Sequence, residues 1–243
     1  MSEEATFQVD AAIVDLDGTM VDTLGDFEAA LNRMLRDLRL PAVAAATIGT
    51  MVGKGSEHLI ASVLQHVLSP DAAGPPAHGG SAAEPVTQQV QRLYDGAWQR
   101  YQQHYLAING QHSLVYPGVV EGLQALRARG LRLACLTNKP TAFARPLLEA
   151  KGLDGFFDVV FGGDAFERKK PDPLPLLKAC EALGTLPART LMVGDSSNDA
   201  KAARAAGCPV VLVRYGYNHG EPIQDVDADG FIDALAELPP RLR

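Results

Sequence analysis

The chain has 243 residues, of which 47% are hydrophobic and 21% are charged, and its formal net charge is −7. This composition suits one large domain or a core domain with an insert, and it argues against global disorder. Because the basic residues are scattered along an acidic chain, we expect neither a nucleic-acid partner nor an anionic membrane surface. No apolar run approaches the roughly 20 residues that span a bilayer, and the start lacks a secretion signal, so we expect a cytoplasmic protein.

The first predicted strand lies in the stretch AAIVDLDG at 11–18. An apolar run of this length that ends at a glycine is typical of a strand buried on both faces of a sheet. The run leads directly into Asp15 and Asp17. One aspartate at the end of a strand favours no function by itself, so the meaning of this pair depends on which groups join it.

The segment from 22 to 112 interrupts the strand pattern and is predicted to be helical. Apolar and aromatic residues recur at helical spacing in three stretches, at 26–38, 56–68 and 90–106. A Pro-, Gly- and Ala-rich stretch at 69–85 separates the last two and is interpreted as a loop between helices. We therefore expect residues 22–112 to form a helical domain inserted after the first strand.

Strands and helices alternate through the rest of the chain. Apolar runs predict strands at 131–138, 156–163, 190–197 and 209–216. Helical stretches that end at glycines lie between them, which indicates an α/β domain with a mostly parallel sheet, formed by residues 1–21 and 113–243. Ligands of such sheets bind at the carboxyl ends of the strands. Asp15, Thr137 and Asp195 all lie at those ends.

Together these residues have the parts that phosphoryl transfer requires. Asp15 can attack phosphorus and form an aspartyl-phosphate, and Asp17, on the same side of an extended strand, can act as the general acid and base. Two carboxylates this close repel each other, so we expect a divalent cation between them, and Mg²⁺ suits ligands that are all oxygen.

The later strands supply the remaining groups. Thr137 and Asn138 can hold phosphate oxygens through a hydroxyl and neighbouring backbone amides, and Lys170 offers a fixed cation. Asp195 is a further candidate metal ligand. Asp199, one helical turn later, is placed beside the metal or Lys170. Each group alone is a weak signal, but four pieces in this order, each at a strand end, favour phosphoryl transfer.

The motifs DLDGT, LTN, KKPDP and GDSSND make the chain similar to phosphatases of the haloacid dehalogenase superfamily, and the resemblance spans nearly the whole chain. It implies a Rossmann-like parallel-sheet core with an inserted all-helical cap domain. It also implies Asp15 as nucleophile, Asp17 as acid and base, and Thr137 and Lys170 as phosphate binders. Metal would be held by the Asp15 side chain, the Asp17 backbone carbonyl and Asp195.

Within that superfamily the stretches MVGKGSEHLI, YPGVVEGLQALRARG and DAFERKKPDPLPLLKA most resemble phosphoglycolate phosphatases. The resemblance implies a small-molecule phosphate ester as substrate and a monomer or homodimer. Gly53 and Gly55 permit a tight backbone approach to a small ligand, and Lys54 between them is a candidate partner for a substrate carboxylate.

Other activities remain open at this point. A sugar-phosphate phosphatase, a phosphosugar mutase and a pyrophosphatase would all keep Asp15 and Asp17, because the core recognises only phosphate. A dehalogenase or phosphonatase would lack an acid at Asp17. A more distant alternative is a non-catalytic phosphoacceptor module, which needs neither Asp17 nor a large helical insert.

Overall fold

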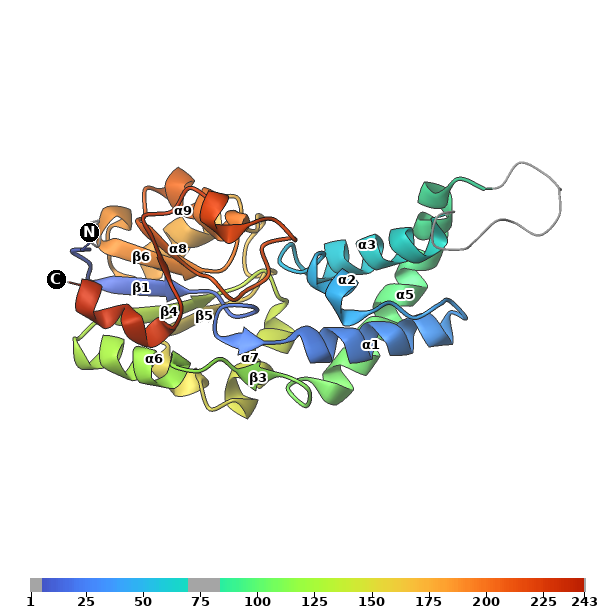
Figure 1. Ribbon diagram of the computed structural model, residues 1–243, viewed down its shortest axis with the longest axis horizontal. Helices are drawn as coiled ribbons and strands as arrows, with labels where there is room; N and C mark the ends of the chain where they lie inside the picture. Colours follow the sequence, from blue (N-terminus) through green and yellow to red (C-terminus); the bar gives the residue numbers. More distant parts are fainter. Residues whose placement is uncertain (1–5, 70–83, 243) are drawn as a thin grey trace.

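The computed structural model describes residues 6–69 and 84–242. They form two lobes, one built on a sheet and one built only of helices (Figure 1). The loop predicted at 69–85 lies outside the described residues except at its two ends.

The sheet lobe contains six parallel strands in the order β5-β4-β1-β6-β7-β8. The strands are β1 (Ala11–Val14), β4 (Arg132–Leu136), β5 (Val159–Phe161), β6 (Thr190–Gly194), β7 (Val210–Val213) and β8 (Gly230–Ile232). β1 lies between β4 and β6, with Val14 paired to Cys135 on one side and to Val193 on the other. The carboxyl ends of these three central strands therefore meet at one edge of the sheet.

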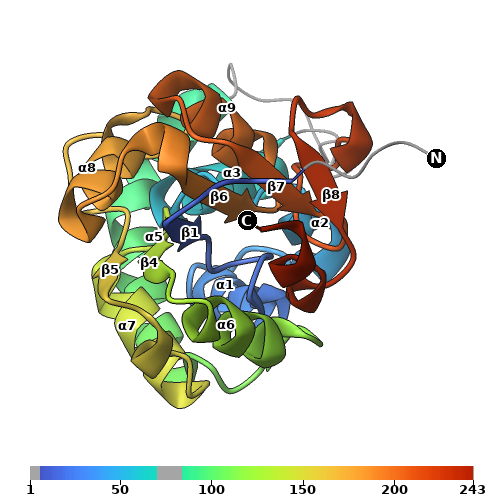
Figure 2. The same cartoon turned by 90° about the vertical axis from the view of Figure 1, so that its left-hand side faces the viewer.

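Helices cover both faces of the sheet (Figure 2). They are α6 (Val119–Ala128) and α7 (Thr141–Ala150) on one face, and α8 (Leu174–Leu183) and α9 (Ser197–Ala206) on the other. Short 3₁₀ helices lie at η1 (Asp154–Phe156), η2 (Pro187–Arg189), η3 (Ile223–Asp225), η4 (Leu235–Glu237) and η5 (Pro239–Arg241). The side chains of β1 alternate between the two apolar clusters, as a strand buried on both faces requires. The predicted α/β class is confirmed.

The helical lobe lies between β2 (Val21–Asp22) and β3 (Leu114–Val115) in the sequence. Its helices are α1 (Leu24–Asp37), α2 (Ala45–Gly49), α3 (Ser56–Leu68) and α5 (Val86–Ile108). They pack around an apolar cluster of their own, which includes the predicted aromatic stripe at Tyr101 and Tyr105. We call residues 22–112 the helical insert; that these exact limits bound a separate domain stays a prediction.

The two ends of the helical insert run side by side. β2 and β3 pair as a short antiparallel ribbon, with Val21 opposite Val115. The buried Asp26 carboxylate accepts hydrogen bonds from the backbone amides of Gly110 and His112, both at 2.7 Å. These contacts fix the junction between the lobes. Among the described residues, no helix combines the length and the apolar character that crossing a membrane requires.

Candidate active site

A cavity of about 30 Å³ lies where the carboxyl ends of the central strands face the helical insert. Nine of the residues that the sequence predicts for the site line this cavity: Asp15, Asp17, Gly53, Gly55, Thr137, Asn138, Lys170, Asp195 and Asp199. Lys54 does not line it, and its side chain is exposed. A contact between Lys54 and substrate therefore stays a prediction without support from its position.

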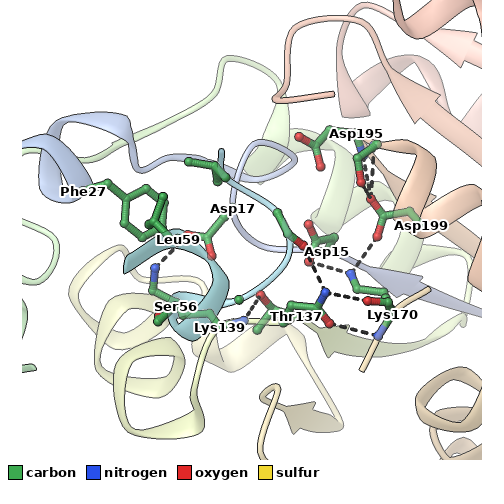
Figure 3. A pocket seen from close by; sticks show the side chains of 15 residues that line it. Asp15, Asp17, Phe27, Ser56, Leu59, Thr137, Lys139, Lys170, Asp195 and Asp199 are labelled. Atoms are coloured by element: carbon green, nitrogen blue, oxygen red, sulfur yellow. Dashed lines mark hydrogen bonds and ion pairs between the residues drawn. The ribbon is translucent and has the colours of Figure 1, made fainter. Parts of the chain in front are cut away.

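Asp15 and Lys170 form the centre of the site (Figure 3). Asp15 follows β1 directly, and its backbone amide donates to the carbonyl of Val193 in the neighbouring strand at 2.9 Å. The Lys170 ammonium donates to Asp15 Oδ1 at 2.8 Å, to Asp199 Oδ1 at 2.7 Å and to the Leu136 carbonyl at 2.9 Å. Because an ammonium has three N–H donors, Lys170 is fully satisfied and rigidly held.

Asp199 reaches this position because it belongs to the first turn of α9. Ser196 is the N-cap of that helix, and Ser196 and Asp199 form a capping box. Asp199 Oδ2 accepts from the Ser196 hydroxyl at 2.7 Å, which leaves Oδ1 for Lys170. The same carboxylate thus caps the N-terminus of α9 and orients the buried Lys170.

Three buried carboxylates converge on the cavity. Oxygen atoms of Asp15, Asp195 and Asp199 lie within 4.8 Å of one another. Burial raises the pKa of Asp15 to about 7, against the opposing charge of Lys170. Burial also raises the pKa of Asp195 well above its usual range, and the nearby Asp199 adds to the effect. A hard divalent cation would offset the burial and mutual repulsion that raise these pKa values, and clustered carboxylate oxygens are ligands that suit such a cation.

The loop of Asp17 is shaped by a glycine. Gly18 has a φ of +83°, and a Cβ at this position would lie 2.1 Å from Asp195 Oδ2. Glycine thus permits both the turn and the close approach of Asp195. The next residue, Thr19, donates its hydroxyl to Asp195 Oδ1 at 3.2 Å.

Asn138 lies in the cavity wall, but its side chain is used within the protein. Its amide group donates to the Gly53 carbonyl at 3.0 Å and to the Lys170 carbonyl at 2.9 Å, and its oxygen accepts from the Lys170 backbone at 3.0 Å. The side chain therefore links the Lys170 loop to the loop of the helical insert. The hydroxyl of the neighbouring Thr137 accepts from the Lys139 backbone amide at 3.1 Å.

Sequence reasoning missed Lys139. Its ammonium donates to Asp17 Oδ1 at 2.8 Å and lies 4.5 Å from the ring centre of Phe27 and 4.7 Å from that of Tyr105. The lysine is visible in the motif LTNK, but its partners in Asp17 and the helical insert are distant in the sequence. Tyr217 was missed too, and its backbone amide donates to Asp195 Oδ2 at 2.6 Å.

A parallel sheet with helices on both faces and an aspartate cluster at the carboxyl ends of its strands defines a Rossmann-like α/β scaffold with an acidic site. The family of haloacid dehalogenase-like hydrolases matches residues 9–207. The chain is 43% identical to a phosphoglycolate phosphatase of Thiobacillus denitrificans over 229 residues, 94% of this chain and 93% of that protein. It is 38% identical to a phosphoglycolate phosphatase of Escherichia coli O157:H7, over 94% of this chain and 90% of that protein.

A solved structure agrees with these relatives. The crystal structure of a predicted phosphoglycolate phosphatase from Haemophilus somnus superimposes with a TM-score of 0.84 at 33% identity, over 95% of this chain and 96% of that one. The protein belongs to the haloacid dehalogenase-like hydrolases. It is a phosphoric monoester hydrolase that resembles the phosphoglycolate phosphatases along nearly its whole length.

Proposed function

We propose that the protein is a Mg²⁺-dependent phosphatase that hydrolyses 2-phosphoglycolate to glycolate and phosphate through an aspartyl-phosphate. The observation that carries the chemistry is the convergence of Asp15, Lys170 and Asp195 on one buried cavity. The choice of substrate is supported by the relatives named phosphoglycolate phosphatase.

The first step forms a bond between an Asp15 carboxylate oxygen and phosphorus and breaks the bond to the leaving oxygen. Asp17 gives its proton to that oxygen, so glycolate leaves as an alcohol. In the second step Asp17 takes a proton from water, which attacks phosphorus and releases phosphate and the free Asp15 carboxylate. Lys170 holds positive charge beside Asp15 throughout and orients it for attack.

The donor set fits a magnesium ion, because the atoms that converge here are carboxylate oxygens. Asp15, Asp195 and the Asp17 backbone carbonyl would hold the ion, which supplies positive charge against the buried acids and the phosphate. Asp199 was also predicted as a ligand. Because its two oxygens accept from Lys170 and Ser196, we assign it to holding Lys170 in place.

The helical insert would act as the cap over this site. Its loop reaches the sheet lobe at Gly53, whose carbonyl accepts from Asn138 at 3.0 Å and from Asn198 at 3.2 Å. Phe27 and Leu59 of the insert line the cavity opposite the sheet. A cap in this position excludes water from the reacting phosphate and selects the leaving group.

The test is phosphate release by the purified protein from 2-phosphoglycolate, a sugar phosphate and pyrophosphate, each with Mg²⁺ and with a chelator. We expect the highest kcat/KM on 2-phosphoglycolate and no turnover with the chelator. A higher kcat/KM on the sugar phosphate or pyrophosphate would make the proposed substrate wrong and leave the phosphatase chemistry standing. Full activity in the chelator would contradict the metal dependence.

A further inference from the structure

Lys139 is a buried cation beside the group that must meet the leaving oxygen. Its side chain is 1% exposed, yet it lines the cavity together with Asp17. It follows β4, and its backbone carbonyl accepts from Gly163 at 2.8 Å, so the segment that carries it is fixed. In Figure 3 it lies on the side of the cavity formed by Asp17, Phe27 and Ser56, away from Lys170.

The hydrogen bonds of Lys139 leave donor capacity that Lys170 does not have. Only Asp17 accepts a hydrogen bond from the Lys139 ammonium among the described residues, whereas Lys170 donates all three of its N–H groups. The other neighbours of the Lys139 ammonium are the ring faces of Phe27 and Tyr105. Ring faces attract a cation but offer no lone pair of the strength of a carboxylate. A buried ammonium in this state is ready to bind a second anion.

The position of Asp17 fixes where such an anion would come from. Asp17 must touch the oxygen that joins the phosphate to the leaving group if it is to protonate it. In a phosphate ester of a 2-hydroxy acid, the carboxylate is attached to the carbon that carries this oxygen. Because Lys139 lies 2.8 Å from Asp17 Oδ1, a carboxylate placed there falls beside the ammonium.

We propose that Lys139 binds the substrate carboxylate and thereby selects phosphate esters of 2-hydroxy acids over neutral esters. This assignment rests on the proposed phosphatase function and deepens it. It also replaces Lys54 as the source of the positive charge, since Lys54 is exposed and outside the cavity wall. Phe27 and Tyr105 keep water from the ammonium, which strengthens its attraction for a carboxylate.

The experiment compares two esters that differ only in charge, 2-phosphoglycolate and its carboxamide, 2-phosphoglycolamide. The variant is Lys139→Met, whose side chain fits between Phe27 and Tyr105. A lost charge-assisted hydrogen bond corresponds to a ~10- to 100-fold drop in kcat/KM. We expect that drop on 2-phosphoglycolate beyond any loss on the carboxamide. Lys54→Met removes the same charge outside the cavity and should leave the ratio of the two substrates unchanged.

Equal losses on the two esters in Lys139→Met would show that the lysine only positions Asp17, and would overturn the proposal. Folding of the variant is checked by its thermal unfolding midpoint, and Lys139→Gln serves if Lys139→Met does not fold. Failure of the proposed function looks different, because the wild type would then release phosphate from neither ester.

A binding experiment tests whether Lys139 recognises the substrate carboxylate without relying on turnover. Calorimetry measures the affinity of both esters for Asp15→Asn and for the double variant Asp15→Asn with Lys139→Met, at fixed Mg²⁺. The proposal expects the carboxylate ester to lose about 10- to 100-fold in affinity in the double variant while the carboxamide changes little. An unchanged ratio would overturn the proposal whatever the kinetics show.

Discussion

Two lysines mark the two halves of the cavity, and they are held in opposite ways. Lys170 is supplied, like all its partners, by the sheet lobe, and each of its N–H groups has an oxygen acceptor. In the part of the chain that the structure describes, Lys139 has one acceptor, Asp17, and two aromatic faces that come from α1 and α5 of the helical insert. The phosphate half is a closed polar network, whereas the leaving-group half combines a single ion pair with apolar walls.

This difference corresponds to what each half has to recognise. A phosphate group is the same in every substrate, so the groups that bind it gain from being fixed before it arrives. The leaving group varies between substrates. Discrimination between leaving groups requires a site whose hydrogen-bonding groups are satisfied only when the correct leaving group is bound. The sheet lobe therefore carries the groups that act on the phosphate, and the side that faces the helical insert discriminates between leaving groups.

The largest effect is expected from breaking the phosphate half. Asp15→Asn replaces the nucleophile by an amide of the same shape, so turnover should fall by at least about 10³-fold, as the removal of enzyme nucleophiles does. Phosphate release from 2-phosphoglycolate measures the loss. The control is Asp227→Asn, which changes an aspartate whose side chain is 82% exposed and should leave the rate unchanged. A rate near wild type in Asp15→Asn would refute covalent catalysis through this residue.

The next effect tests the boundary between the halves. Asp17→Asn removes the proton donor, a contribution of typically ~10²–10⁴-fold in rate. An ester such as 4-nitrophenyl phosphate has a leaving group that needs no proton, so its first step should suffer less than that of 2-phosphoglycolate. Aspartyl-phosphate should then accumulate and be detectable after acid quenching. Equal losses on both esters, without a trapped intermediate, would count against acid–base catalysis by Asp17.

The sequence predicts the phosphate half better than the leaving-group half for a physical reason. Asp15, Thr137 and Asp195 each follow an apolar run, and parallel strands bring their ends to one edge whatever the details of packing. Lys139 and Asp17 are 122 residues apart, and their pairing depends on how the loops and the helical insert close over the sheet. No local sequence pattern predicts the contact between Lys139 and Asp17.

Local sequence patterns also fail to predict the structure where an element is short, and they do not show which residues of a glycine-containing loop face the site. The three residues of β8 and the five of α2 are too short to show a period. Gly53 and Gly55 do line the cavity, as their freedom of conformation suggests, but the chain turns between them and leaves Lys54 exposed. Which side of a loop faces a site is a tertiary property.

A smaller effect is expected at the junction of the two lobes. The Tyr217 hydroxyl accepts from the backbone amides of Thr23 at 3.0 Å and Leu24 at 3.2 Å, where α1 begins, while its own backbone amide holds Asp195. Tyr217→Phe leaves the Thr23 amide without its acceptor and removes the hydrogen bond that the hydroxyl donates to the Asp22 carboxylate, so it should lower the free energy of unfolding by about 1–2 kcal/mol. Denaturant unfolding measures this change.

Because the contact with Asp195 comes from the backbone and survives the substitution, kcat/KM of Tyr217→Phe should fall by less than about 10-fold. Tyr94→Phe removes a hydroxyl with one long contact, 3.4 Å to the Glu57 carbonyl, and should be nearly neutral in stability. A large loss of activity in Tyr217→Phe with unchanged stability would mean that the junction controls the chemistry, and the division between the halves would not hold.

The smallest effect concerns His219, which lies where the insert loop meets the sheet lobe. Its Nε2 is 3.3 Å from Asn198 Nδ2, and a Cβ at Gly53 would lie 2.9 Å from its Cε1. Burial lowers the pKa of His219, and the charge of Lys54 adds to the effect. The folded protein therefore resists protonation of this ring, and a proton on Nε2 would place a donor against the Asn198 amide.

The sign of the pH dependence follows from that lowered pKa. Above about pH 6.5 the ring is neutral in both the folded and the unfolded chain, so it contributes no slope. As the pH falls below that value the unfolded chain takes up a proton that the folded chain refuses, and stability is lost down to the lower folded pKa. We expect the unfolding midpoint to drop between pH 7.5 and 5.5 in part because of this residue. His219→Gln should reduce this drop, whereas His66→Gln, at an exposed position on α3, should not. If the two variants kept the same slope as the wild type, the contact at Gly53 would not depend on a neutral His219, and the insert would be anchored to the sheet lobe by Asn138 and Asn198 without it.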